Sequence, residues 1–221
     1  MKKAIVSFVL SLMFPLVLFA DGYTSLWKQY NEAETKDLPK TQIKILNNII
    51  AQAKAGKSYG NLLKAEFDKV ATAFGISDEL FQSELSALKK AAGEASAVDP
   101  ALAAVYNCAL GCSYSLVAKS YYKSDSKKLS REYFDKALAD PEMLASKKAL
   151  DYAPFVREGV DSEIFGNDLL SLVGYYSERY ALLNDYYNKA GNRRASLVTA
   201  LWMLEKRVKA NPVKKVIKGN T

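Results

Sequence analysis

The chain has no histidine, the side chain that most often serves as a general base or a metal ligand. It has only two cysteines, Cys108 and Cys112. Ser-His and Cys-His catalytic pairs are therefore excluded, and two thiolates alone are half of a tetrahedral zinc site. Any catalysis would have to rest on carboxylates, lysine, tyrosine or cysteine, and we expect neither a cofactor nor a metal.

The two cysteines lie four residues apart in an apolar segment, which places them on one face of a helix. Bridging two thiols along one helix would strain a disulfide. We therefore expect buried structural thiols, while an oxidising compartment would favour the alternative of a disulfide.

The acidic residues give no catalytic or calcium-binding pattern. Glu158, Asp161, Glu163 and Asp168 cluster in one irregular stretch, but their spacing does not match a calcium-binding loop. We expect them to be solvated charges, with Asp168 in the first turn of a helix. No carboxylate pair elsewhere indicates the acid and base of a glycosidase.

Residues 1–20, "MKKAIVSFVLSLMFPLVLFA", have two lysines, an apolar run and a terminal Ala20. This pattern is typical of a secretory signal peptide with cleavage before Asp21. The alternative is a membrane anchor, but the apolar run of about 17 residues is broken by Pro15 and lies near the lower limit for spanning a bilayer. We therefore expect an exported chain, periplasmic or associated with the cell surface, without stable membrane insertion after cleavage.

The formal net charge of +7 is unevenly distributed. Without the lysines of the signal segment, the whole remaining excess lies in residues 200–221, where a single Glu205 stands against six basic residues: Lys206, Arg207, Lys209, Lys214, Lys215 and Lys218. Because the rest of the chain is neutral and this end resembles a basic disordered tail over residues 211–221, we expect no nucleic-acid partner.

Apolar residues recur at helical spacing almost throughout, and no segment shows sustained two-residue alternation, so we predict an all-α fold. The first helix is expected over residues 25–36 and an irregular stretch over 153–166. One continuous helix is expected over 167–190, and the last helix follows a turn at Gly191. Further helices should begin at caps or first-turn prolines: Asp37, Ser58 or Tyr59, Ser77, Asp99, Ser130, Pro141 and Asn167.

Successive antiparallel hairpins of about 30–40 residues, with bulky and small side chains at packing positions, are typical of helical-repeat proteins. We predict a degenerate tetratricopeptide-like α-solenoid over residues 21–210, in which each hairpin buries its apolar face against its neighbours.

Two segments carry a resemblance to a known family. Residues 23–67 contain an "LW" pair and "KDLPKT", and residues 159–207 contain "FGNDLLSLVG" and "YYNKAGNRRASL". This chain resembles, in these motifs, the helical N-terminal region of the very large alpha-2-macroglobulin family proteins of Bacteroidetes. The matching residues are Leu26, Trp27, Lys36 to Lys40, Phe165, Asp168 to Ser171, Gly174, Tyr186, Tyr187, Ala190 to Arg193, Ala195 and Leu197.

The resemblance implies an exported helical module of the kind that precedes macroglobulin β-domains. The thioester signature of such proteins is missing, because "ALGC" follows Cys108 and "SYSL" follows Cys112. Covalent protease trapping is therefore not expected of this chain, which we interpret as the front module alone or as a gene fragment.

Fourteen tyrosines, several in adjacent pairs, are the remaining signal. On one helix over 167–190, Tyr176, Tyr180 and Tyr187 would share a face, with Arg179 and Arg193 as polar partners. Core packing is the alternative, but such a face in a solenoid groove would bind an extended peptide.

Function is predicted accordingly. We expect a non-enzymatic module that binds a protein partner. The alternatives are a carboxylate-based carbohydrate-active enzyme and a fragment without a separate function. A deep pocket with two facing carboxylates would favour the enzyme, and a shallow groove with tyrosine and arginine would favour the binder.

Overall fold

The computed structural model describes residues 22–121, 124–157, 159 and 161–210. The predicted signal segment and the predicted basic tail over 211–221 lie outside this part. The described residues form helices and turns without a strand, and one isolated antiparallel bridge joins Lys148 to Asp168. The all-α prediction is confirmed.

A first helix over residues 22–35 precedes the labelled helices. These are α2 (Pro39–Gly56), α3 (Tyr59–Phe74), α4 (Asp78–Ser96), α5 (Pro100–Tyr121), α6 (Ser124–Ala137), α7 (Pro141–Ala145), the 3-10 turns η1 (Ala149–Tyr152) and η2 (Ser162–Phe165), α8 (Leu169–Tyr176), α9 (Tyr180–Lys189) and α10 (Arg193–Ala210).

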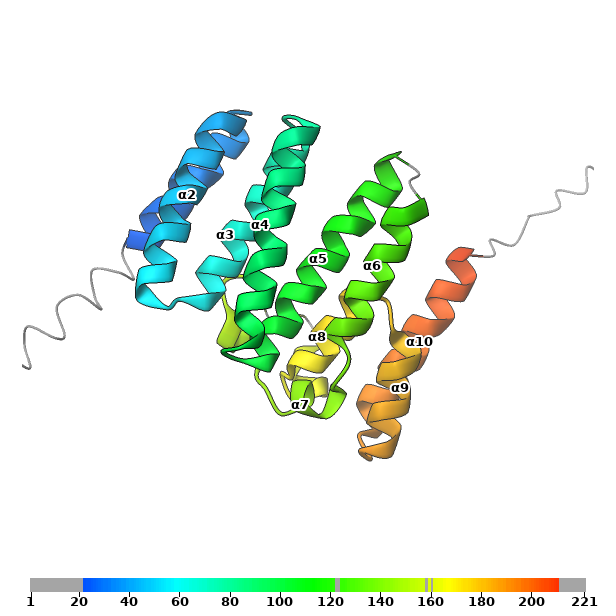
Figure 1. The fold of residues 1–221 in the computed structure, drawn as a ribbon. Helices are drawn as coiled ribbons and strands as arrows, with labels where there is room; N and C mark the ends of the chain where they lie inside the picture. Colours follow the sequence, from blue (N-terminus) through cyan, green and yellow to red (C-terminus); the bar gives the residue numbers. More distant parts are fainter. Residues whose placement is uncertain (1–21, 122–123, 158, 160, 211–221) are drawn as a thin grey trace, which may run out of the picture.

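Helices that follow one another in the chain pack against one another. The pairs α2–α3, α3–α4, α4–α5, α5–α6 and α9–α10 make the main contacts, and the helices stand side by side in chain order (Figure 1). The segment from α7 to α8 crosses beneath this row, where η1 contacts α3 and α8 contacts α5. The predicted helical-repeat solenoid is confirmed.

The buried apolar side chains form two clusters that meet across α3. Leu62 and Ala65 of α3 belong to a first cluster with the helix over 22–35 and α2. Leu63 and Val70 belong to a second cluster that continues through α4, α5, α6 and α8 to α10. Because α3 is buried on two faces, it connects the N-terminal hairpin to the rest of the stack.

The helix α5, which begins at Pro100, lies at the centre of the fold. Within the described residues, Pro100–Ala118 is long and apolar enough to cross a membrane, but 72% of it is buried, as in the core helix of a globular fold. A Cβ at Gly111 would lie 2.5 Å from the ring of Phe134, so the glycine lets α6 approach closely. Ser130 donates a hydrogen bond of 2.8 Å to the carbonyl of Gly111.

Several helix caps are as predicted. Ser77 accepts a hydrogen bond from the backbone N–H of Leu80 at 3.2 Å, and Asp99 accepts one from Ala101 at 2.9 Å. Tyr59 begins α3 as expected.

Other predicted boundaries are wrong. Ser130 lies inside α6, which begins at Ser124. Asp37 has φ 51 and ends the first helix, while Leu38 takes the N-cap position of α2. Asn167 has φ 56, and the cap of α8 is Asp168. The helix expected to begin at Pro141 is short: it ends at Ala145, and the 3-10 turn η1 follows it.

The largest difference is the single helix expected over 167–190, which is two helices. α8 ends at Tyr176 and α9 begins at Tyr180. Glu178 has φ 54, its N–H bonds to the carbonyl of Tyr175, and the N–H of Arg179 bonds to the carbonyl of Gly174 at 2.9 Å. This is the hydrogen-bond pattern of a Schellman ending, with glutamate where glycine is usual.

Candidate functional site

Three adjoining cavities share one side chain, Tyr176. Their volumes are about 320, 370 and 750 Å³. The two larger cavities also share Phe67 and Cys112, and the two smaller ones share Arg157 and Leu172. We call the combined surface the Tyr176 groove.

The end of α8 positions Tyr176. Neighbouring side chains on a helix point about 100° apart. Tyr175 packs its ring 5.0 Å from that of Trp202, whereas Tyr176 meets the ring of Tyr175 edge-on at 5.9 Å and keeps 59% of its surface exposed. The turn at Glu178 then leads the chain into α9 and places Arg179 beside the same cavity. Tyr176 and Arg179 thus lie on the two sides of the turn that ends α8, and both line the largest cavity.

The largest cavity combines an apolar floor with a basic rim. Its apolar lining includes Phe67, Phe81, Leu116 and Phe134. Four basic side chains line it, with Glu178 as the single acidic residue among its described lining residues: Lys127, Arg131, Arg179 and Lys206.

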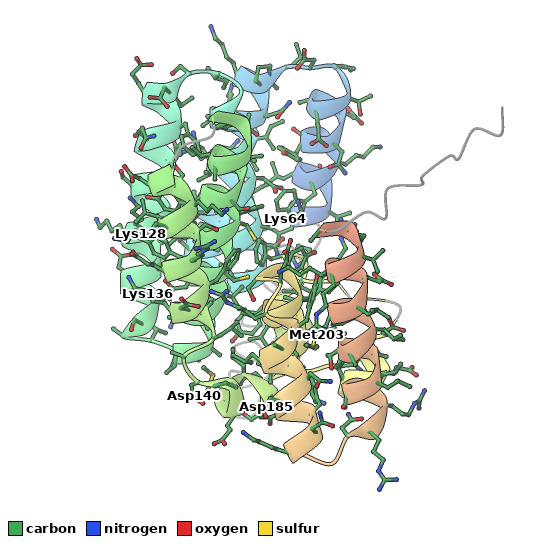
Figure 2. The ribbon with its side chains drawn as sticks, turned by 90° about the vertical axis from the view of Figure 1, so that its right-hand side faces the viewer. Lys64, Lys128, Lys136, Asp140, Asp185 and Met203 are labelled. Atoms are coloured by element: carbon green, nitrogen blue, oxygen red, sulfur yellow. The ribbon has the colours of Figure 1, made fainter. Side chains whose placement is uncertain are left out.

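Two of these four cations have ion pairs. Arg179 lies 2.5 Å from Asp135 of α6, and Lys206 lies 2.8 Å from Glu178. Lys127 and Arg131 stand one turn apart on α6 and are exposed. Figure 2 views this end of the molecule, with α6, which carries Lys128 and Lys136, beside the hairpin of α9 and α10, which carries Asp185 and Met203. The rim of this cavity thus attracts negative charge.

The smallest cavity is walled by aromatic rings. Phe165 and Trp202 stack 5.3 Å apart, and Tyr175 closes a second side. The Oδ1 atom of Asn167 is buried there without a hydrogen-bond partner.

Asp168, which also lines this cavity, forms hydrogen bonds with other residues of the fold. Its carboxylate accepts the backbone N–H of Ser171 at 2.8 Å and the hydroxyl of Tyr187 at 2.7 and 2.9 Å. Burial raises the pKa of Asp168, and the hydrogen bonds from Tyr187 and Ser171 oppose this shift. Burial and the nearby carboxylate raise the pKa of Tyr187. The expectation that Asp168 is a solvated charge is wrong, because it is 7% exposed.

The predicted tyrosine face does not exist as one surface, because α8 ends at Tyr176. Tyr187 lies in the core with 3% of its surface exposed. Tyr180 packs 5.6 Å from Trp202. Arg193 is exposed at the start of α10 and is not among the residues that line the groove. Of the five predicted residues, Tyr176 and Arg179 lie in the groove, and their role in binding stays a prediction.

Phe67, Lys127 and Arg131 line the groove but were not predicted. Lys127 and Arg131 are four residues apart, a spacing that places two basic side chains on one helix face. The pair was not predicted because the predicted helix began at Ser130, which left Lys127 outside it.

The chemistry available to the groove is limited. No group of three metal-ligating side chains occurs among the residues that the structure describes. No disulfide joins Cys108 and Cys112, and a hydrogen bond with Cys112 together with burial raises the pKa of Cys108. Cys108 is therefore a poor nucleophile. Of the acidic cluster, Asp161 lines the smallest cavity with Asp168, Glu163 is exposed, and Glu158 lies outside the described residues.

Fold and groove together define an all-α helical-repeat protein with a surface groove that is aromatic in its middle and basic at one end. Comparisons of the chain with family models, with curated proteins and with solved structures give no match.

Proposed function

We propose that this protein is a non-enzymatic, exported helical-repeat module that binds an extended segment of a protein partner in the Tyr176 groove. The observation that carries this proposal is the exposed ring of Tyr176 at the point where three cavities meet. Exposed aromatic side chains beside apolar cavities are typical anchors of protein interfaces. A helical stack presents such a groove to an extended chain without a change of its own fold.

The charges of the groove indicate the chemistry of the partner. Lys127, Arg131 and Arg179 rim the largest cavity, whose floor is apolar. A segment with an aliphatic or aromatic side chain and with carboxylates close by would place the first in the cavity and the second on the rim.

Export and the resemblance to the macroglobulin-like family belong to the same proposal. The lysines and apolar run of residues 1–20 support export. The motifs quoted above support a module that acts as a platform for a protein partner.

The alternative predictions have less support from the described residues. Of the two acids in the smallest cavity, Asp168 caps α8 and holds Tyr187, so it is not available as one member of a catalytic carboxylate pair. A fragment without a separate function would leave the exposed Tyr176 unexplained.

Peptide binding tests the proposal. The expected mature chain, residues 21–221, would be used to select 12-residue peptides from a displayed random library, and the affinities would be measured by fluorescence anisotropy. We expect Tyr176→Ala to weaken binding about tenfold or more, because it removes an aromatic anchor. Arg131→Glu should weaken binding of the acidic peptides.

The matched controls change neighbouring exposed positions. Lys128→Glu alters α6 by the same charge as Arg131→Glu, but Lys128 does not line the groove. Tyr59→Ala removes an exposed ring from α3. Circular dichroism would verify that all variants fold. Selected peptides that bind Tyr176→Ala as well as the original chain would refute the groove, and a failure to select any peptide would refute the binding module.

A further inference from the structure

The outer face of α10 carries an uncovered stripe of aliphatic side chains. Leu197, Leu201, Leu204 and Val208 are 64%, 51%, 57% and 58% exposed. Their spacings of four, three and four residues place them on one side of the helix. We call this surface the α10 stripe.

The stripe lies opposite the face that joins α10 to the fold. Ala195 and Thr199 are fully buried on the inner face, and Trp202 packs on Phe165 from the same side. Among the described residues no further helix covers this side of α10, and an end face of a helical stack that stays open to water is normally polar. An apolar stripe at this position therefore indicates that a further surface covers it.

Basic residues flank the stripe on both sides. At 100° per residue, Arg193 and Arg207 lie on one side, and Arg194 and Lys209 lie on the other. Glu205 is the single acidic residue of α10. Of the basic residues of the C-terminal end that lie on α10, Arg207 and Lys209 flank the stripe, whereas Lys206 lies on the opposite side and pairs with Glu178.

These charges argue against a second copy of this chain as the covering surface. In an antiparallel pair of α10 helices, Arg193 and Arg194 of one copy would meet Lys209 of the other. In a parallel pair, each cation would meet the same cation of the other copy. A seam of four side chains is also far smaller than the roughly 800 Å² per partner that stable interfaces bury.

We propose that the α10 stripe binds the surface of an anionic lipid bilayer. A helix with leucines on one side and arginine and lysine beside them lies in the interface, with its apolar side chains among the acyl chains and its cations at the lipid phosphates. The sequence beyond α10 also combines basic and aliphatic residues, with Lys214, Lys215 and Lys218 among Val213, Val216 and Ile217. Such an attachment lies on the bilayer without spanning it, and it is independent of the Tyr176 groove.

Vesicle flotation tests this inference. Residues 21–221 would be mixed with vesicles of phosphatidylglycerol and phosphatidylcholine, and separately with vesicles of phosphatidylcholine alone. We expect flotation with the anionic vesicles only, and less flotation as salt is raised. The double variant Leu201→Ser/Leu204→Ser should reduce the partition coefficient about tenfold or more, because two exposed leucines no longer enter the bilayer. Arg207→Gln/Lys209→Gln should reduce it as well.

The control variant Leu38→Ser removes a leucine that is 45% exposed at the start of α2, at the opposite end of the row of helices from α10 (Figure 1). It should float as the original chain does. The inference is overturned if the chain does not float with anionic vesicles, or if the Leu201→Ser/Leu204→Ser variant floats undiminished. It is also overturned if sedimentation velocity shows a dimer that this variant abolishes, since a second copy then covers the stripe.

Discussion

Asp168 performs a structural task that the sequence assigns to its neighbour. A short polar residue before an apolar helix predicts an N-cap, and both Asn167 and Asp168 satisfy that rule. The structure selects Asp168, because its carboxylate also accepts the hydroxyl of Tyr187 from α9. That contact joins residues 19 positions apart and is invisible to a local pattern. The tyrosine thus belongs to the core although its spacing from Tyr180 suggested a surface.

The raised pKa of Asp168 predicts a pH dependence of stability. Its carboxyl group binds a proton more readily in the folded protein than in the unfolded chain, whose aspartates have a pKa of about 4. The corresponding stabilisation is complete below that value and is lost as the pH rises through the higher folded value. Asp168→Asn cannot titrate, so the stability of the original chain relative to this variant should fall as the pH rises from about 4 toward neutrality.

Urea unfolding of both proteins at several pH values in this range measures the difference. Asp185→Asn, which removes an exposed carboxylate of α9, controls for the loss of one charge. A difference that stays constant, or that changes in favour of the original chain as pH rises, would contradict the assignment.

Helix existence follows from the sequence more reliably than helix ends do. The apolar periodicity predicts α2, α3, α4 and α5 because each buries apolar side chains at helical spacing, on one face in α2 and α4, on two in α3 and over nearly the whole surface in α5. Three helices end at residues with positive φ that are not glycine: Asp37, Lys57 and Glu178. Sequence rules expect glycine at such positions, so nothing in the sequence marks the break at Glu178. One helix was therefore predicted where there are two, and the predicted tyrosine face does not form.

The positive φ of Lys57 leads to a prediction about the end of α2. A non-glycine residue in the left-handed region costs about 1–2 kcal/mol, and Lys57 has φ 52 on the surface. Lys57→Gly should therefore increase the free energy of unfolding by about 1 kcal/mol. Lys44→Gly, an exposed position inside the same helix, should decrease it by about 1 kcal/mol. Chemical denaturation measures both, and equal effects of the two glycines would refute the backbone explanation.

The groove is a property of the whole stack, which explains why the sequence predicted only part of it. Phe67 of α3, Arg131 of α6 and Tyr176 of α8 line one cavity although more than forty residues separate each from the next along the chain. Each residue reads locally as one position on an amphipathic helix. Only the packing of α8 against α5 brings them together, and that contact depends on the crossing segment, where Gly60 of α3 lies against the backbone of Ala153. Patterns of three or four residues carry no information on such contacts.

The division of the core at α3 predicts that the two ends of the molecule unfold separately. Ile49 of α2 is fully buried in the first cluster, and Ile49→Ala should remove about 2–5 kcal/mol from that cluster. In a stack held by contacts between neighbours, this loss should appear mainly in the helix over 22–35 and in α2.

Hydrogen exchange with mass spectrometry measures the effect. In Ile49→Ala, amides of those two helices should exchange about tenfold faster or more, while amides of α5 and α6 keep their protection. Leu110→Ala, a fully buried position of α5 in the second cluster, should give the reverse distribution. If Ile49→Ala accelerates exchange equally in every helix, the molecule unfolds as one unit, and α3 transmits the loss of packing rather than confining it.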